Sequence, residues 1–239
     1  MSSFLGEFIG TALLIILGNG VVANVVLDKT KGNNGGWIVI TFGWAIAVFI
    51  AVVVSSHFSK AHLNPAITIA MAYLDDGFSF KEVPAYIGGQ MTGAMAGSFL
   101  VWLNYRLHFN ATLNGDAKLA AFCTGPAIRH SITNLLTEIT GTFVLVFAVL
   151  YIAAPSSSLG ALDALPVALV VLGIGLSLGG PTGYAINPAR DLGPRIMHFI
   201  LPISNKRNSD WSYAWIPLIG PVIGGLLAAL VFEMIGMKI

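Results

Sequence analysis

The chain has little charge and almost no cysteine. Only 10% of its 239 residues are charged, while 56% are hydrophobic. Ordinary globular domains carry roughly 25% charge, and a soluble fold of this length could not bury so much apolar surface, so the expected solvent is lipid. A net charge of +1 gives no reason to expect nucleic acid or an acidic partner. Cys123 is the single cysteine, which excludes an intramolecular disulfide and a cysteine-based metal site.

The sequence also lacks the marks of a metalloenzyme and of a cleaved leader. Its five histidines share no metal-ligand spacing, and we find no nucleophile–base pair, so we predict no metal, no cofactor and no enzymatic activity. No basic region precedes the first apolar run, and Glu7 lies early in it, which argues against a signal peptide. No linker interrupts the chain, so residues 1–239 are predicted to form one membrane domain.

What the chain does have is long apolar runs. A bilayer core of about 30 Å needs roughly 20 apolar residues of helix. Pro65–Leu74 and Pro188–Leu201 reach about half that depth and are predicted to be re-entrant half-helices, which must be buried by protein or line a water-filled cavity. The predicted fold class is therefore an all-α membrane protein with six transmembrane helices and two half-helices. The six spans are predicted at Phe4–Leu27, Trp37–Ser56, Val83–Tyr105, Ile132–Ala154, Ala161–Leu178 and Ser212–Ile235.

The sequence repeats itself in two halves. Gly6–Thr11 is similar to Thr137–Thr142, 131 residues later, and Asn64-Pro65-Ala66 recurs 123 residues later as Asn187-Pro188-Ala189. The halves, at about 1–114 and 125–239, each hold three spans and one short segment. Because an odd number of spans reverses direction, the second half must enter the membrane from the opposite face. The two short segments should then meet near the middle of the bilayer.

Each short segment begins with Asn-Pro-Ala. Asn is a strong N-cap and Pro is favoured at the first helical position, so Asn64 and Asn187 should cap the two half-helices. A capping amide oxygen accepts a backbone N–H, which leaves the amide NH2 free to donate into a shared lumen. Each helix N-terminus also carries about half a positive charge. Two such ends aimed at one point would oppose cations and orient a passing water, which interrupts a proton-conducting chain.

These motifs resemble those of a known family. His62-Leu63-Asn64-Pro65-Ala66 and Asn187-Pro188-Ala189-Arg190 are similar to the two signatures of the aquaporin and aquaglyceroporin family, the major intrinsic proteins, and the resemblance covers essentially the whole chain. It implies passive diffusion of water and small uncharged solutes through a pore in each monomer of a homotetramer. It also implies a multi-pass protein in the lipid bilayer with both termini in the cytoplasm. The plain N-terminus and short loops suggest a bacterial cytoplasmic membrane.

The resemblance also implies a selectivity filter and its supports. Counting from the second motif gives Gly175, Tyr184 and Arg190 as filter positions, and counting from the first gives Trp44. Arg190 would line the constriction, bind substrate hydroxyls and repel cations; an ion pair with the neighbouring Asp191 is the alternative. The resemblance implies that the loops are supported by Glu7, Glu138, His62 and Asp191. A proton-coupling role for the two glutamates, as in a coupled transporter, is the competing interpretation.

The filter positions also indicate the solute. Trp44 and Gly175 resemble the glycerol type, because water-selective members place a histidine beside the arginine and a bulkier group at the glycine position. Asp191 is also typical of the glycerol branch. Tyr184 departs from the pattern, since glycerol facilitators usually carry Phe there, and its hydroxyl can donate and accept a hydrogen bond. We therefore predict glycerol, with dihydroxyacetone, urea, hydrogen peroxide, undissociated lactic acid or water as alternatives. Tyr184 could also serve packing alone.

One signal opposes the implied orientation. With both termini inside, three lysines lie on the inner side and most of the other cationic residues lie outside. The positive-inside rule would choose the reverse orientation. The charge bias alone therefore does not fix the orientation, and the family resemblance is the basis for the expectation. The inner lysines would be Lys60, Lys81 and Lys238.

Overall fold

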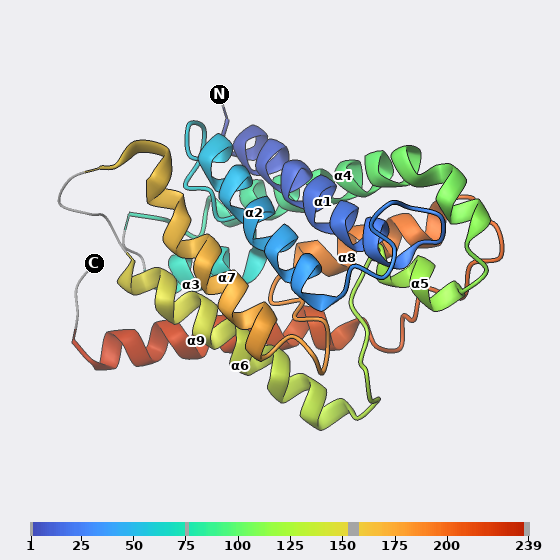
Figure 1. Cartoon of the computed structure of the whole chain (residues 1–239). Helices are drawn as coiled ribbons and strands as arrows, with labels where there is room; N and C mark the ends of the chain where they lie inside the picture. The colour runs from blue at the N-terminus through green and yellow to red at the C-terminus, as the bar shows by residue number, and fades with distance from the viewer. Residues whose placement is uncertain (1, 75–76, 153–157, 237–239) are drawn as a thin grey trace.

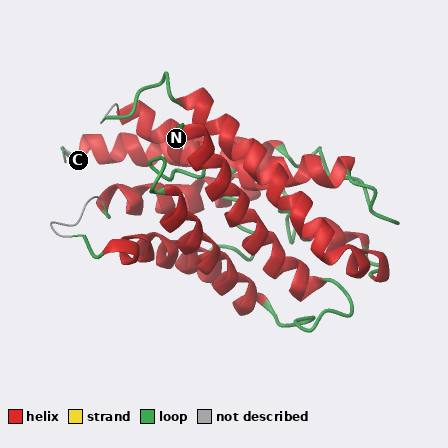
Figure 2. Ribbon diagram, turned by 90° about the horizontal axis from the view of Figure 1, so that it is seen from above, coloured by secondary structure: helices red, strands yellow, loops and turns green. Residues whose placement is uncertain are grey.

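The structure is a computed structural model that describes residues 2–74, 77–152 and 158–236, and within these residues it contains helices and loops but no strand (Figure 2). The helices of the first half are α1 (Ser3–Val26), α2 (Trp37–Ser55), α3 (Pro65–Leu74), α4 (Val83–Ala111) and α5 (Gly115–Ala120). Those of the second half are α6 (Ser131–Tyr151), the 3-10 helix η1 (Gly160–Ala164), α7 (Leu165–Ser177), α8 (Pro188–Ile200) and α9 (Trp215–Met234).

The helices fall where the apolar pattern predicts them. Within the described residues, α1, α2, α6, α9 and the joined η1–α7 segment are long and apolar enough to cross a membrane. The third predicted span, Val83–Tyr105, is also a helix, but α4 is not apolar enough to join that group. It runs to Ala111, six residues beyond the predicted Tyr105, and its last turns contain Arg106 and His108. Ala153 and Ala154, the predicted end of the fourth span, lie outside the described residues.

Two details of the helices differ from the predicted segments. The predicted span Ala161–Leu178 is divided, because a 3-10 turn precedes α7 and Pro166 occupies the first turn of the α-helix. The short helix α5 lies between the third and fourth predicted spans, where no helix was predicted. Asn114 caps it by accepting hydrogen bonds from the backbone N–H groups of Asp116 and Ala117 at 2.8 and 3.3 Å.

Glycines allow two pairs of helices to touch backbone to backbone. In α4, a Cβ on Gly89 would lie 2.4 Å from the Phe4 carbonyl of α1, and one on Gly93 would lie 2.3 Å from the Phe8 carbonyl. In α9, a Cβ on Gly224 would lie 2.3 Å from the Ile139 carbonyl of α6. The α1–α4 and α6–α9 pairs therefore pack closely, as expected for small residues at membrane helix contacts.

The helices give the molecule two distinct ends (Figure 1). One end, called the terminal end here, holds the start of α1 and the end of α9, where Tyr73 of α3 donates a hydrogen bond to Glu233 at 3.3 Å. The other, called the α5 end, holds the loop after α1, which bonds to the end of α4 through Asp28 N and Thr112 Oγ1 at 2.8 Å. The half-helix α3 runs toward the terminal end and α8 runs toward the α5 end, so their N-termini face each other inside the molecule.

Candidate functional site

The loops that lead into α3 and α8 share an unusual backbone. Ala61 and Leu63 have φ values of 51° and 52°, and Tyr184 and Ile186 have φ values of 38° and 43°. Such left-handed conformations are uncommon for residues other than glycine and persist only where the surroundings hold them. Each loop has them at alternate residues, one and three positions before its Asn.

A buried glutamate holds each loop in this conformation. Glu7 of α1 accepts hydrogen bonds from the backbone N–H groups of His62 and Leu63 at 3.0 and 2.7 Å. Glu138 of α6 accepts from those of Ala185 and Ile186 at 3.0 and 2.8 Å. Neither glutamate lines the lumen described below. Both therefore contact the loops through backbone N–H groups, as the family resemblance implies.

Glu7 has two further donors that the sequence did not indicate. Ser59 Oγ donates to it at 2.6 Å, and Gln90 Nε2 of α4 donates at 2.8 Å. The same Gln90 amide lies 2.9 Å from Thr68 Oγ1 of α3. The first loop, its half-helix and α4 are thus joined through one buried carboxylate.

Asn64 and Asn187 cap their half-helices as predicted. Asn64 Oδ1 accepts the Ala66 N–H at 2.9 Å, and Asn187 Oδ1 accepts the N–H groups of Ala189 and Arg190 at 3.0 and 3.2 Å. Pro65 and Pro188 occupy the first helical positions, where no N–H is needed.

The two half-helices are also bonded to each other, which corrects one expectation. Asn64 Nδ2 donates to the Ile186 carbonyl at 2.8 Å, and Asn187 Nδ2 donates to the Leu63 carbonyl at 2.7 Å. The amide groups are therefore not wholly free, because one N–H of each is used across the contact. An amide NH2 has two hydrogens, so each Asn retains one donor for the lumen.

A single elongated cavity of about 260 Å³ passes both asparagines. It extends from Lys60 and Ala61, near the terminal end, to Trp44 and Arg190, on the side of the α5 end. Its apolar wall is formed by side chains of α1, α2, α3, α6 and α7, among them Leu14, Val48, Val52, Ile67, Leu145, Val149, Val167 and Val171. We call this cavity the lumen.

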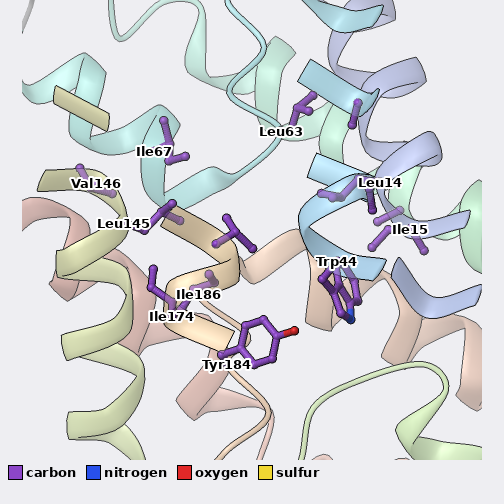
Figure 3. Packing of buried hydrophobic residues seen from close by; sticks show 14 of the residues in the cluster. Leu14, Ile15, Trp44, Leu63, Ile67, Leu145, Val146, Ile174, Tyr184 and Ile186 are labelled. Atoms are coloured by element: carbon purple, nitrogen blue, oxygen red, sulfur yellow. The ribbon is translucent and has the colours of Figure 1, made fainter. Parts of the chain in front are cut away.

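Three of the four predicted filter residues, Trp44, Tyr184 and Arg190, line the lumen on the α5 side. Arg190 lies over the ring of Trp44, with its guanidinium carbon 4.1 Å from the ring centroid. Figure 3 shows the Tyr184 hydroxyl directed toward Trp44. The Trp44 Nε1 and Tyr184 hydroxyl groups are buried and have no hydrogen-bond partner within the described residues. Unpaired buried donors beside a lumen are available to a solute.

Gly175 stands behind Tyr184 instead of on the lumen wall. A Cβ at this position would lie 3.0 Å from Cζ of Tyr184 and 2.9 Å from Cγ2 of Thr41. Because Gly175 has no side chain, the Tyr184 ring can pack directly against it. Tyr184 itself lines the lumen, and Gly175 is not among the lining residues that the structure describes.

Asp191 pairs with Arg195, and not with Arg190. The Arg195 Nε and Asp191 Oδ1 atoms are 2.8 Å apart, and the other carboxylate oxygen accepts from Thr124 N and Thr124 Oγ1 at 2.8 and 2.6 Å. Arg195 also donates to the carbonyls of Ser209, Asp210 and Thr124. Arg190 is thereby left to the lumen, and the alternative of an Arg190–Asp191 pair is wrong.

His62 both anchors its loop and lines the lumen. Its backbone N–H bonds to Glu7, and its ring packs against Phe78 and Tyr86 with centroids 4.7 and 4.8 Å apart. Within the described residues no group of three or more metal-ligating side chains comes together.

Comparison with known proteins identifies this architecture. The family model described as "Major intrinsic protein" matches residues 1–232. The chain belongs to the major intrinsic protein family. It is 58% identical to a "Probable glycerol uptake facilitator protein" of Thermotoga maritima over 98% of this chain and 99% of the relative. It is 56% identical to a "Glycerol uptake facilitator protein" of Streptococcus pneumoniae R6, again over 98% of this chain and 99% of the relative.

A solved structure gives the same result for the fold. The aquaglyceroporin of Plasmodium falciparum superposes with a TM-score of 0.86 at 31% identity, covering 97% of this chain and 94% of that one. The predicted fold class is confirmed, and the major intrinsic protein described here is a multi-pass membrane protein.

Sequence reasoning missed the residues that surround the predicted site. Arg195 had a signal, because it follows Asp191 by four residues on a helix and such pairs lie on one face. Gln90 and Ser59 had none, since their contacts with Glu7 join segments 83 and 52 residues apart. Trp37, which bonds to Gly175, also had no local signal.

Proposed function

We propose that the protein is a passive channel that conducts glycerol, other small uncharged solutes and water, and excludes ions and protons. One observation carries the proposal: a single lumen has an apolar wall and, on its α5 side, unpaired polar groups on Trp44 and Tyr184 beside the Arg190 guanidinium. A polyol has a carbon face and a hydroxyl face. The wall accommodates the first and the donors bind the second, without any covalent step.

The same lumen supports the exclusion of ions and protons. The N-termini of α3 and α8 meet at Asn64 and Asn187, and each contributes about half a positive charge. Arg190 adds a full charge beside Trp44 and Tyr184, so a cation meets a barrier. The free N–H of each Asn binds the oxygen of a passing water and turns its hydrogens away. A continuous proton-conducting chain is then interrupted.

We also propose roles for the remaining predicted residues. Glu7 and Glu138 act as structural supports of the loops, since their carboxylates accept from loop N–H groups and neither glutamate lines the lumen, which does not suit a proton-coupling acid. Asp191 supports α8 against the loop at Thr124, and His62 supports the first loop.

The assembly and placement are proposed on the basis of family membership. The protein forms a homotetramer with one pore in each monomer, in a bacterial cytoplasmic membrane with both termini inside. The two halves, at about 1–114 and 125–239, form an inverted repeat. Support comes from the equivalent pairs Glu7–Gly89 and Glu138–Gly220, in which a Cβ on the glycine would lie 3.0 and 2.8 Å from the Cβ of the glutamate.

Stopped-flow light scattering on proteoliposomes tests the proposal, with glycerol, water and dihydroxyacetone compared under matched osmotic gradients. We expect rapid re-swelling in glycerol that is independent of pH and sodium gradients. Gly175→Val should slow it strongly, because the added side chain displaces Tyr184. Gly173→Ala is the matched control on the same helix, since a Cβ there meets nothing within 4 Å. Fast water flux without glycerol entry in the unmodified protein would refute glycerol as the solute.

A second variant tests charge exclusion. Arg190→Ala removes the full positive charge beside Trp44 and Tyr184, so we expect measurable cation leak in liposomes. A cation leak no greater than that of the unmodified protein would remove Arg190 from the exclusion mechanism.

Tyr184 favours a second candidate solute. Its unpaired hydroxyl adds a donor and acceptor and occupies space beside Arg190, which could suit dihydroxyacetone, urea, hydrogen peroxide or undissociated lactic acid better than glycerol. High flux of one of these together with poor glycerol flux would establish this candidate.

A further inference from the structure

Trp37 lies at the first position of α2 and reaches across to the last turn of α7. Its indole Nε1 donates a hydrogen bond to the Gly175 carbonyl at 2.9 Å. Because α7 ends at Ser177, Gly175 carries one of the last four carbonyls of the helix, which lack an intrahelical donor. Trp37 therefore satisfies this carbonyl and ties the start of α2 to the end of α7.

The same indole ring packs against Tyr184. The two ring centroids are 5.7 Å apart and the planes meet at 79°, an edge-to-face contact. Only 4% of the Tyr184 surface is exposed, and its backbone lies in the left-handed region at φ 38°. Its position is thus held by its neighbours.

Two glycines complete the packing around this ring. A Cβ on Gly179 would lie 2.4 Å from Cδ1 of Tyr184 and 2.8 Å from Cζ2 of Trp37, and a Cβ on Gly175 would lie 3.0 Å from Cζ of Tyr184. The Tyr184 ring is therefore enclosed by Trp37, Gly175 and Gly179 on the sides away from the lumen. Movement of Trp37 would give the ring room to retreat.

We propose that Trp37 is a positioning residue that sets the size of the solute the channel passes. It holds the Tyr184 ring against the lumen and keeps the Gly175 carbonyl occupied, so that the Tyr184 hydroxyl faces the solute. This inference rests on the proposed function, because it assigns Trp37 to the same constriction. A different role would be that of a membrane-interface anchor, since tryptophan is enriched there and Trp37 is 40% exposed.

The size selectivity of Trp37 variants distinguishes the positioning role from the role of an interface anchor. The measured quantity is the ratio of erythritol to glycerol permeability in proteoliposomes, with water permeability as the check that each variant is folded. Trp37→Leu removes both the hydrogen bond and the ring, so we expect the ratio to rise several-fold. Trp37→Phe keeps a ring and loses the hydrogen bond, so we expect a smaller rise. Trp211→Leu is the matched control, because Trp211 is 44% exposed on the same end and contacts Phe199.

Gly179→Ala tests the inference from the other direction. Its methyl group would lie 2.4 Å from Cδ1 of Tyr184 and 2.6 Å from the Gly175 carbonyl oxygen, so the ring and the end of α7 must both move. We expect the ring to move into the lumen and the erythritol-to-glycerol ratio to fall. If Trp37→Leu does not fold, Trp37→Phe and Gly179→Ala together decide the question. Ratios equal to that of the unmodified protein in water-conducting variants would overturn the inference and leave Trp37 as an interface anchor.

Failure of the proposed function would give a different experimental result from failure of the Trp37 inference. An unmodified protein that passes water but no glycerol refutes the proposed function alone. Trp37→Leu should then admit glycerol, since the constriction widens. Continued exclusion of glycerol by a water-conducting Trp37→Leu variant would overturn the inference as well.

Discussion

The two loops that enter the half-helices have the same backbone but different surroundings. Residues 61–64 and 184–187 share the alternating left-handed φ values, a glutamate behind two N–H groups and a capping asparagine. At equivalent positions, however, the first loop has Ala61 where the second has Tyr184. The two loops therefore share a backbone path but present side chains of very different size to the lumen.

The half-helices also differ in charge. Helix α3 is apolar and uncharged, whereas α8 contains Arg190, Asp191 and Arg195. Four donors, on His62, Leu63, Ser59 and Gln90, surround Glu7, whereas Ala185 and Ile186 supply two N–H groups to Glu138. The first half is stabilised around its glutamate, and the second around a buried ion pair. The two halves thus use one scaffold with the polar interactions placed at different points.

The largest expected effect is loss of Glu7. Glu7→Ala leaves four donors without this acceptor, three of them on the buried residues His62, Leu63 and Gln90, and each buried unsatisfied donor costs about 1–3 kcal/mol. Glu138→Ala leaves the backbone N–H groups of Ala185 and Ile186 without their acceptor. We expect both variants to be severely destabilised, and Glu7→Ala more so, as measured by denaturant unfolding in mixed micelles. A greater loss of unfolding free energy in Glu138→Ala than in Glu7→Ala would contradict the conclusion that the first half depends more on its glutamate.

The second-largest effect is expected for the ion pair between Arg195 and Asp191 in the second half. Arg195→Met leaves Asp191 buried without its cation, and breaking a buried pair costs about 3–5 kcal/mol. Arg207→Met is the matched control, because Arg207 pairs with Asp116 at the surface, where such a pair contributes about 0–1 kcal/mol. Equal unfolding free energies for the two variants would show that the pair does not stabilise α8.

A smaller effect is expected at Gln90. Gln90→Met keeps the length of the side chain but removes one donor to Glu7 and the contact with Thr68, so we expect a loss of about 1–3 kcal/mol. Glycerol flux per folded protein should be unchanged, because Gln90 does not line the lumen. Lowered flux at full folding would mean that Gln90 acts on the pore itself.

The smallest expected effect is at Tyr184. Tyr184→Phe removes only the hydroxyl, which has no protein partner within the described residues, so stability should hardly change. We expect glycerol flux to rise by a few-fold, since the hydroxyl no longer narrows the lumen beside Arg190. Flux equal to or below that of the unmodified protein, measured by light scattering, would show that the hydroxyl does not restrict glycerol.

Local rules made the elements of the site predictable. Both half-helix starts follow from Asn and Pro at the cap and first position, and the capping bonds of Asn64 and Asn187 are those that the side-chain chemistry demands. The same local rules gave no sign that each amide would also bond to the opposite loop. These two hydrogen bonds join residues that are separated by 122 and 124 positions in the sequence, so no short-range pattern could predict them.

The sequence by itself determined that this protein lies in a membrane and where its half-helices begin, because apolar length and capping are local properties. The expectation that Trp44 and Tyr184 lie beside Arg190 came from the family resemblance. Only the tertiary structure decided that Asp191 pairs with Arg195, that Gln90 completes the shell of Glu7 and that Trp37 stands behind Tyr184. Those partners come from different helices, and their pairing depends on how closely the glycine-lined helices pack, which is a property of the whole fold.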